Sequence, residues 1–297
     1  MGDKSVMPAS RLWRDTLLTA VVPLIWGSTY LVTTQWLPAG LPFSAGVLRV
    51  LPAGLLLLLW TRHLPQRQEW PRLLLLSLLN IGAFQALLFV AAYRLPGGIA
   101  AVLGAIQPLL MMGLLWGLER QTPRPLVLLA ACAGLAGMAV LLNAGNARWD
   151  SIGVLAAAGG AVVMALGMYL ARRWGSSLPL LALTGWQLAL GGLMLLPAAL
   201  WLDPPLPALS AANVAGYAYL SLVGALLAYG LWFRGLRLLP PVAVSALGLL
   251  SPVAAVILGW VALGQRLHGW TLIGMVTVLA SVLCVQLASS RRPARAG

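Results

Sequence analysis

Residues Leu87–Glu119, LLFVAAYRLPGGIAAVLGAIQPLLMMGLLWGLE, contain the pattern that decides the fold. An apolar stretch ends at an Arg-Leu-Pro turn, and a second apolar stretch carries an interior Gln-Pro pair before it stops at an acidic residue. The same plan returns at Ala228–Gln265, AYGLWFRGLRLLPPVAVSALGLLSPVAAVILGWVALGQ. A plan repeated at a spacing of about half the chain predicts two related halves, residues 1–146 and 147–297.

The composition indicates a helical membrane protein. Of the 297 residues 61% are hydrophobic and only 8% are charged, too few charges to cover the surface of a soluble domain. A bilayer core of ~30 Å needs ~20 apolar residues per helix, and the turn residues divide the chain into segments of about that length. We therefore predict an all-α polytopic membrane protein with ten transmembrane helices, at residues 15–36, 42–61, 71–93, 97–117, 125–143, 152–172, 178–201, 213–234, 241–263 and 268–288.

The positive charges predict the orientation in the membrane. The formal net charge is +13, but its lysines and arginines lie in alternate loops, which favours a lipid bilayer over nucleic acid as the partner. Fifteen of the 19 lie on the side of the N-terminus, three (Arg94, Arg148 and Arg266) lie on the other side, and Arg49 falls inside a span. Both termini are therefore expected in the cytoplasm, with the chain in the cell (inner) membrane as a multi-pass monomer.

The number of spans per half has a consequence for mechanism. Five spans in each half mean that the second half enters the bilayer from the opposite side, so the halves are inverted repeats. This arrangement is typical of secondary transporters, which bind a solute near the midplane and open to either side by rocking one half against the other.

Several motifs are similar to those of a known family. The first span contains Trp26-Gly27-Ser28-Thr29-Tyr30, the second contains Arg49, and both halves carry the repeated Pro-turn and interior-Pro plan. In these features the chain resembles the EamA family of the drug/metabolite transporter superfamily. The resemblance implies a carrier of small metabolites, often an exporter, and among its members the chain is most similar to the YddG-like amino-acid exporters.

Catalytic groups are missing from the interior of the predicted spans. The acids and histidines all lie at span ends or in loops: Asp3, Asp15, Glu69, Glu119, Asp150, Asp203, His63 and His268. No set of zinc ligands, nucleophile elbow or phosphate loop is present, so we expect neither an enzyme nor a cofactor or metal. Because proton-driven carriers commonly use a buried acid or histidine, we expect facilitated diffusion or coupling by another route.

Polar and aromatic residues inside the spans are the candidates for substrate binding. An unpaired amide in an apolar environment costs ~1–3 kcal/mol, so such groups are expected to face a partner, water or a ligand. The helical period places aromatic and methionine side chains on the same faces. The predicted substrate-binding residues are Trp26, Tyr30, Asn80, Gln85, Gln107, Met164, Met168, Ser221 and Trp232. Each also has an interpretation as packing, interhelical hydrogen bonding or interfacial anchoring.

Three other features have two interpretations each. Arg49 attracts an anionic or carboxylate group, or it caps carbonyls of neighbouring helices or extends toward the outer interface of the membrane. Pro108 and Pro252, at equivalent places in the two halves, form a hinge or only a static kink. The sequence Gly113–Gly117 fits the GxxxG motif, for which internal close packing is favoured over a dimer face.

The preferred substrate is an amino acid or a related small metabolite, moved outward through a central cavity. The alternatives are export of drug-like hydrophobic or cationic metabolites and, from other classes, a non-transporting membrane scaffold or a lipid-modifying enzyme. A scaffold needs no polar faces that converge on one cavity, and an enzyme needs a buried catalytic group.

Overall fold

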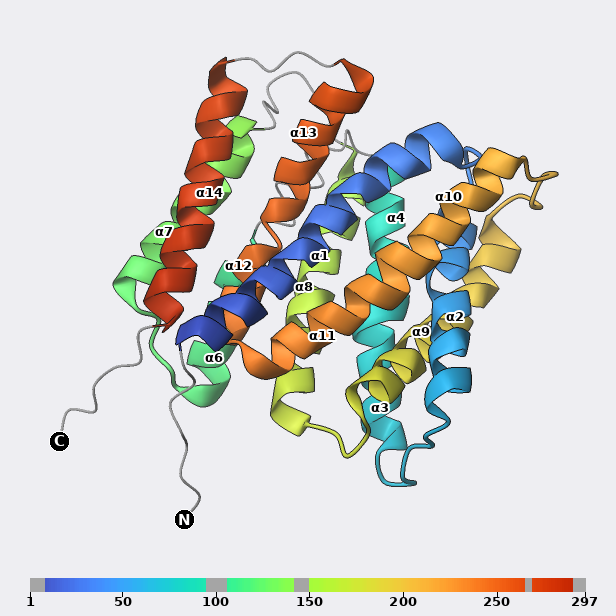
Figure 1. Cartoon of the computed structure of the whole chain (residues 1–297), viewed down its shortest axis with the longest axis horizontal. Helices are drawn as coiled ribbons and strands as arrows, with labels where there is room; N and C mark the ends of the chain where they lie inside the picture. Colours follow the sequence, from blue (N-terminus) through green and yellow to red (C-terminus); the bar gives the residue numbers. More distant parts are fainter. Residues whose placement is uncertain (1–8, 95–105, 142–149, 265–268, 291–297) are drawn as a thin grey trace.

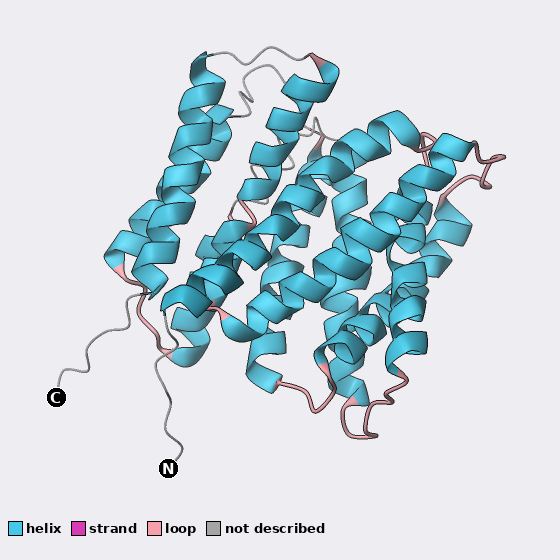
Figure 2. Cartoon of the chain, viewed as in Figure 1, coloured by secondary structure: helices cyan, strands magenta, loops and turns pink. Residues whose placement is uncertain are grey.

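In the described part of the chain all regular secondary structure is helical, and loops connect the helices (Figure 2). The computed structural model describes residues 9–94, 106–141, 150–264 and 269–290. Its helices are α1 (Ala9–Trp36), α2 (Pro42–Thr61), α3 (Trp70–Ser77), the π-helix η1 (Leu78–Ala83), α4 (Phe84–Arg94), α6 (Gln107–Glu119), α7 (Pro125–Leu141), α8 (Ser151–Trp174), α9 (Leu180–Leu202), α10 (Ala211–Ser221), the π-helix η3 (Leu222–Leu227), α11 (Ala228–Leu238), α12 (Pro241–Leu247), α13 (Leu250–Leu263) and α14 (Gly269–Ser290).

Helix length and composition agree with a multi-pass membrane protein. Seven helical stretches in the described residues are long and apolar enough to cross a bilayer, and residues 125–140 and 272–288 form two shorter apolar helices. Of the predicted span at 97–117, residues 97–105 lie outside the described residues, and the part that follows is α6. The number of ten crossings and their inverted arrangement therefore stay predictions.

The outside of the bundle is apolar, as a lipid-facing surface must be. Large hydrophobic side chains such as Leu59, Leu155 and Leu200 are at least 70% exposed. Exposed tryptophans lie at the ends of helices, among them Trp60 at the end of α2 and Trp201 at the end of α9. Tryptophan is enriched at the level of lipid headgroups, so these positions mark the two rims of the membrane-embedded region.

The helices pack as pairs around a central space. α2 packs along α9, α7 along α14, α1 along α13 and α4 along α8, and Figure 1 shows α7 and α14 side by side at one end of the bundle. The α2–α9 contact depends on glycine: an added Cβ at Gly54 would lie 2.3 Å from the backbone nitrogen of Ala189. Here two backbones touch, which only a residue without a side chain permits.

The prediction that the GxxxG motif of α6 packs internally is wrong for the described residues. A Cβ at Gly113 or Gly117 would meet no atom of the described residues within 4 Å. The spacing of small residues shows that a helix has a smooth face, but not whether another helix lies against that face. The close contacts occur instead at glycines in other helices that are not part of a GxxxG motif, including Gly54 in α2 and Gly191 in α9.

Two spans, α3–α4 and α10–α11, are each interrupted by a π-helical segment at a matching place. η1 separates α3 from α4, and η3 separates α10 from α11. A π-helix displaces carbonyl groups from the regular hydrogen-bond ladder and frequently marks a functional site. Here the segments begin 144 residues apart, at Leu78 and Leu222, the same separation as that of Pro108 and Pro252.

One loop contact leads to a prediction on pH. Burial raises the pKa of Glu69, but hydrogen bonds donated by Ser177, Gln66 and Ser176 outweigh this and hold its pKa below the ordinary value. A carboxyl whose pKa is lowered by folding stabilises the fold above its unfolded pKa, near 4.5, and this contribution is lost as the pH falls further. The contact joins the α2–α3 and α8–α9 connections.

We expect Glu69→Gln to lower the melting temperature at pH 7 by about 2 °C or less, because the carboxylate is largely solvent-screened. The difference from the unmodified protein should shrink below pH 4.5, where both side chains are neutral. Thermal unfolding of detergent-purified protein at pH 7 and pH 4 measures both effects. Glu119→Gln is the control, because that carboxylate has only a long ion pair with Arg173, at 4.0 Å, and a hydrogen bond from Gln121 two residues away; an equal loss in both variants at pH 7 would contradict the assignment.

Candidate functional site

A cavity of about 510 Å³ lies in the middle of the bundle. Residues of α1, α2, α4, α6, α8, α11, α12 and α13 line it, and the lining continues to Leu37 and Ala39 in the α1–α2 connection. The volume is in the range of sites for small molecules. Because so many helices line it, the cavity is formed by the whole bundle and not by a single pair of helices.

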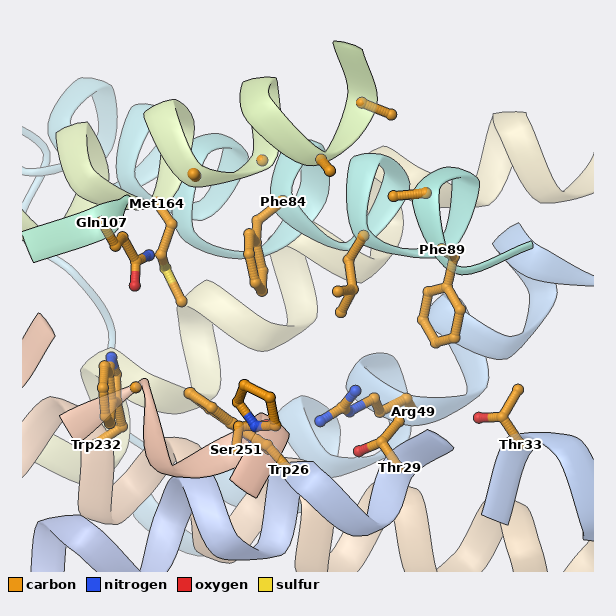
Figure 3. Close-up of a pocket in the computed structure, with 18 of the residues that line it drawn as sticks. Trp26, Thr29, Thr33, Arg49, Phe84, Phe89, Gln107, Met164, Trp232 and Ser251 are labelled. Atoms are coloured by element: carbon orange, nitrogen blue, oxygen red, sulfur yellow. The ribbon is translucent and has the colours of Figure 1, made fainter. Parts of the chain in front are cut away.

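Small side chains of α8 create much of this space. Ala156, Ala157, Gly160, Ala161 and Met164 recur at intervals of one helical turn and form one wall. The neighbouring helix α4, on the same side of the cavity, carries larger side chains, and Figure 3 shows Phe84 and Phe89 extending from it into the opening. The wall is therefore mostly apolar, with polar groups at defined points.

Arg49 supplies positive charge at one end of the cavity. It lies in α2, is only 2% exposed, and its Nη2 donates a hydrogen bond to the carbonyl oxygen of Gly224 at 3.2 Å. The indole Nε1 of Trp26 donates to the same oxygen at 3.1 Å. Gly224 belongs to η3, so the π-helical segment provides a carbonyl on which α1 and α2 converge. Arg49 thus caps a neighbouring helix, as one interpretation expected, and it also faces the cavity (Figure 3).

Two threonines of α1 accompany Arg49. Thr29 and Thr33 are one helical turn apart, and both line the cavity. The hydroxyl oxygens of both are shielded from solvent, and neither has a hydrogen-bond partner among the described residues. Figure 3 shows both beside Arg49 at the same end of the cavity. A guanidinium and two hydroxyls can together donate several hydrogen bonds to one anionic group.

An aromatic cluster forms the floor of the cavity. The ring centroids of Trp26 and Tyr229 are 5.2 Å apart, and those of Trp26 and Trp232 are 5.0 Å apart, both with tilted ring planes. Gln85, which does not line the cavity, donates a hydrogen bond from its Nε2 to the hydroxyl of Tyr229 at 3.1 Å. These tilted ring contacts pack Trp26 against both other rings and define the shape of the floor.

The structure separates the predicted binding residues into two groups. Trp26, Gln107, Met164 and Trp232 line the cavity, and so does the predicted hinge residue Pro252. The others that are described do not line it: Asn80, Gln85, Met168, Ser221 and Pro108. The side chain of Tyr30 lies outside the described residues.

The residues outside the lining have other surroundings. Asn80 donates to Oε1 of Gln187 at 2.9 Å in the interior, and Gln85 acts on the cavity only through Tyr229. Met168 and Ser221 are buried in the protein interior. Polarity within a span correctly indicated that the amides are sequestered from lipid, but the sequence does not distinguish an amide that faces a helix from one that faces a cavity.

Other lining residues were missed, among them Thr29, Tyr229, Ser245 and Ser251. Hydroxyls give a weak signal because serine and threonine also satisfy themselves on their own helix, as Ser245 does by donating to the carbonyl oxygen of Val242 at 2.9 Å. The period of α1 did carry information, because Thr29 and Thr33 lie one and two turns beyond Trp26.

A bundle of apolar helices around a solute-sized cavity defines the class of multi-pass membrane transporters. The sequence model of the EamA-like transporter family matches residues 14–143 and again residues 151–287. The chain belongs to this family and is a membrane transporter, not an enzyme.

Individual relatives agree with this assignment. Protein PecM of Dickeya dadantii (strain 3937) is 42% identical over 266 residues, which cover 89% of each chain. An uncharacterized inner membrane transporter, YedA of Escherichia coli (strain K12), is 28% identical and covers 92% of this chain and 90% of its own length. A solved crystal structure with 22% identity superposes with a TM-score of 0.79 over 93% of this chain and 97% of that chain, which shows a common fold.

Proposed function

We propose that the protein is a secondary carrier that exports amino acids or related small carboxylate-bearing metabolites by alternating access through the central cavity. The observation that carries this proposal is Arg49, buried at the cavity wall beside the hydroxyls of Thr29 and Thr33. A buried guanidinium is costly, and its planar fork of donors matches the two oxygens of a carboxylate, as it does those of a phosphate. The apolar α8 wall suits the side chain of such a solute.

Pairwise helix contacts support two inverted halves. Assume that α1, α4 and α6 of the first half correspond to α8, α11 and α13 of the second half. The contact of α1 with α13 then corresponds to the contact of α8 with α6. By the same rule α1 with α11 corresponds to α8 with α4, and all four contacts occur. Gln85 and Tyr229, which correspond at a separation of 144 residues, hydrogen-bond to each other, as residues close to a two-fold pseudo-axis do.

Polar contacts close one end of the bundle. Arg234 of α11 pairs with Asp15 of α1 at 2.6 Å, and one Nη1 of Arg172 in α8 donates to the carbonyl oxygens of Leu236, Arg237 and Leu239. The cavity lining extends instead toward the α1–α2 connection. With both termini in the cytoplasm, this is a conformation closed on the inside, and transport requires these contacts to break and re-form.

The helix break beside Pro252 is proposed as a hinge. α12 ends at Leu247 and α13 begins at Leu250, and Ser245, Gly248 and Ser251 around the break line the cavity. Pro108 stands at the start of α6, the equivalent place in the other half. Proline has no backbone N–H to donate, so the ladder of backbone hydrogen bonds that would make a continuous helix rigid is interrupted there.

We expect Pro252→Ala and Pro108→Ala each to lower the transport rate about fivefold or more while expression stays near normal, because hinge changes act on conformational rates. Pro197→Ala, at an exposed proline within α9, is the control with no expected effect. Initial rates of solute exchange per amount of reconstituted protein measure this. Unchanged rates in both variants would show that the prolines are static kinks.

Counterflow in proteoliposomes tests the proposed function as a whole. Vesicles loaded with unlabelled leucine are expected to accumulate labelled leucine transiently without an imposed ion gradient. Labelled leucinamide, which lacks the carboxylate, should exchange far more slowly. If the amide or a hydrophobic cation exchanges and leucine does not, the alternative of drug-like cationic solutes is favoured, since the mostly apolar lining also accepts such molecules.

A further inference from the structure

The end of the cavity opposite Arg49 contains a buried donor that no protein group satisfies. The indole Nε1 of Trp232 has no hydrogen-bond partner among the described residues, although Trp232 is only 1% exposed and lines the cavity. Figure 3 shows this nitrogen at the tip of the ring that faces the opening. Trp26, in contact with the same ring, places its own Nε1 on the carbonyl oxygen of Gly224.

The orientation of Trp232 is fixed by packing. The residue belongs to the main core cluster of the bundle, where it packs among side chains that include Met164, Met168 and Tyr229, and its ring lies 5.0 Å from that of Trp26. A buried N–H without an acceptor costs about 1–3 kcal/mol. A closely packed ring that directs an unpaired N–H toward a cavity is suited to donate that hydrogen bond to an acceptor on the bound solute.

Gln107 and Met164 complete this end of the cavity. In Figure 3 the side chain of Gln107 extends from α6 toward Trp232 from the opposite wall, with Met164 of α8 beside it. The amide of Gln107 offers both a donor and an acceptor, whereas the indole only donates. The end opposite Arg49 is therefore polar but carries no formal charge on these three residues.

We propose that Trp232 is a specificity-determining residue that selects solutes with a hydrogen-bond acceptor at the end remote from their carboxylate. This rests on the proposed function and deepens it: the solute is bound at two points, by Arg49 at its carboxylate and by Trp232 Nε1 at a neutral oxygen. A site built to hydrogen-bond a group discriminates against the analogue that lacks it, because the buried donor then stays unpaired.

Methionine and methionine sulfoxide form the test pair, because they differ by one acceptor oxygen. Methylthiopropylamine and its sulfoxide form a second pair with the same end group but no carboxylate. Apparent Kd values of all four compounds are obtained from their concentration-dependent thermal stabilisation of the detergent-purified protein. The unmodified protein is expected to bind each sulfoxide roughly tenfold more tightly than its thioether, the size of effect expected for one buried hydrogen bond.

Trp232→Phe keeps an apolar ring and removes the N–H, and it should bring the ratio of the two Kd values to within about twofold in both pairs. Trp201→Phe, at an 83% exposed position at the end of α9, is the matched control and should keep the ratio. The ratio in the unmodified protein needs no variant, so poor folding of Trp232→Phe does not remove the test.

The two pairs separate the two proposals. Acceptor preference in the amines alone, with no binding of either amino acid, would overturn the amino-acid assignment and support the role of Trp232. Equal binding of sulfoxide and thioether in both pairs, a ratio unchanged by Trp232→Phe, or no stabilisation by any of the four compounds would overturn the role of Trp232. In the first two of these cases, the proposed function would still stand if the amino acids bind and if this binding depends on Arg49.

Discussion

Arg49→Met is expected to reduce counterflow of leucine at least ~100-fold, because the solute carboxylate then enters an uncharged cavity without its strongest donors. Methionine approximates the length of the arginine stem and keeps the packing of α2 against its neighbours. The measurement is the initial rate of labelled-leucine exchange in liposomes with equal amounts of reconstituted protein. Arg49→Lys, which keeps the charge and loses the planar fork, should fall between the two.

Two controls separate recognition from structure in this experiment. Arg94→Met removes an exposed arginine whose partner is Asp150, at 3.3 Å, and should leave exchange unchanged. Slow exchange of leucinamide, where detectable, should not decrease further in Arg49→Met, because that solute has no carboxylate to lose. Full leucine exchange by Arg49→Met would show that Arg49 only caps the carbonyl of Gly224.

Gly54→Ala is expected to have the largest effect on stability. Its Cβ would lie 2.3 Å from the nitrogen of Ala189 and 2.8 Å from the Cα of the same residue, so α2 and α9 must move apart. Overpacking of this kind costs about 1–3 kcal/mol, and more where backbone opposes the new atom. Lower yield of monodisperse protein and a lower melting temperature in detergent are the expected results.

Gly113→Ala is the matched control for this substitution. It makes the same chemical change inside a helix, but the new atom meets nothing within 4 Å among the described residues. Because alanine has a higher helix propensity than glycine by up to ~1 kcal/mol, this variant should be as stable as the unmodified protein or slightly more stable. Equal melting temperatures for Gly54→Ala and Gly113→Ala would contradict the close α2–α9 contact.

The contrast between these two glycines shows what the sequence can predict about the fold. Low charge and apolar segments of bilayer length predict a polytopic helical protein, because the bilayer imposes both. The spacing of Gly113 and Gly117 fits a packing motif, yet Gly54 is the residue in close contact. Which smooth face is covered depends on neighbours that are distant in sequence, and one helix does not encode that.

The candidate site shows the same division. Trp26, Met164 and Trp232 were predicted from helical faces that carry aromatic or methionine side chains, and these faces do line the cavity. Asn80 was chosen by the same reasoning as Gln107, but its partner is Gln187 on α9. The dual environment of Arg49, against both Gly224 and the cavity, depends on the π-helical segment η3, which no pattern of residue types revealed.

Side-specific labelling of one cavity residue tests the proposed alternating access most directly. Ser251 lines the cavity beside the break between α12 and α13. In a background with Cys132 and Cys284 replaced by alanine, Ser251→Cys is expected to react with a membrane-impermeant thiol reagent from either side of sealed, oriented vesicles. Reaction from the cytoplasmic side should disappear when α1 and α11 are cross-linked at Asp15 and Arg234, and reaction from the other side should persist. Reaction from one side only, whether or not the cross-link is present, would contradict the account.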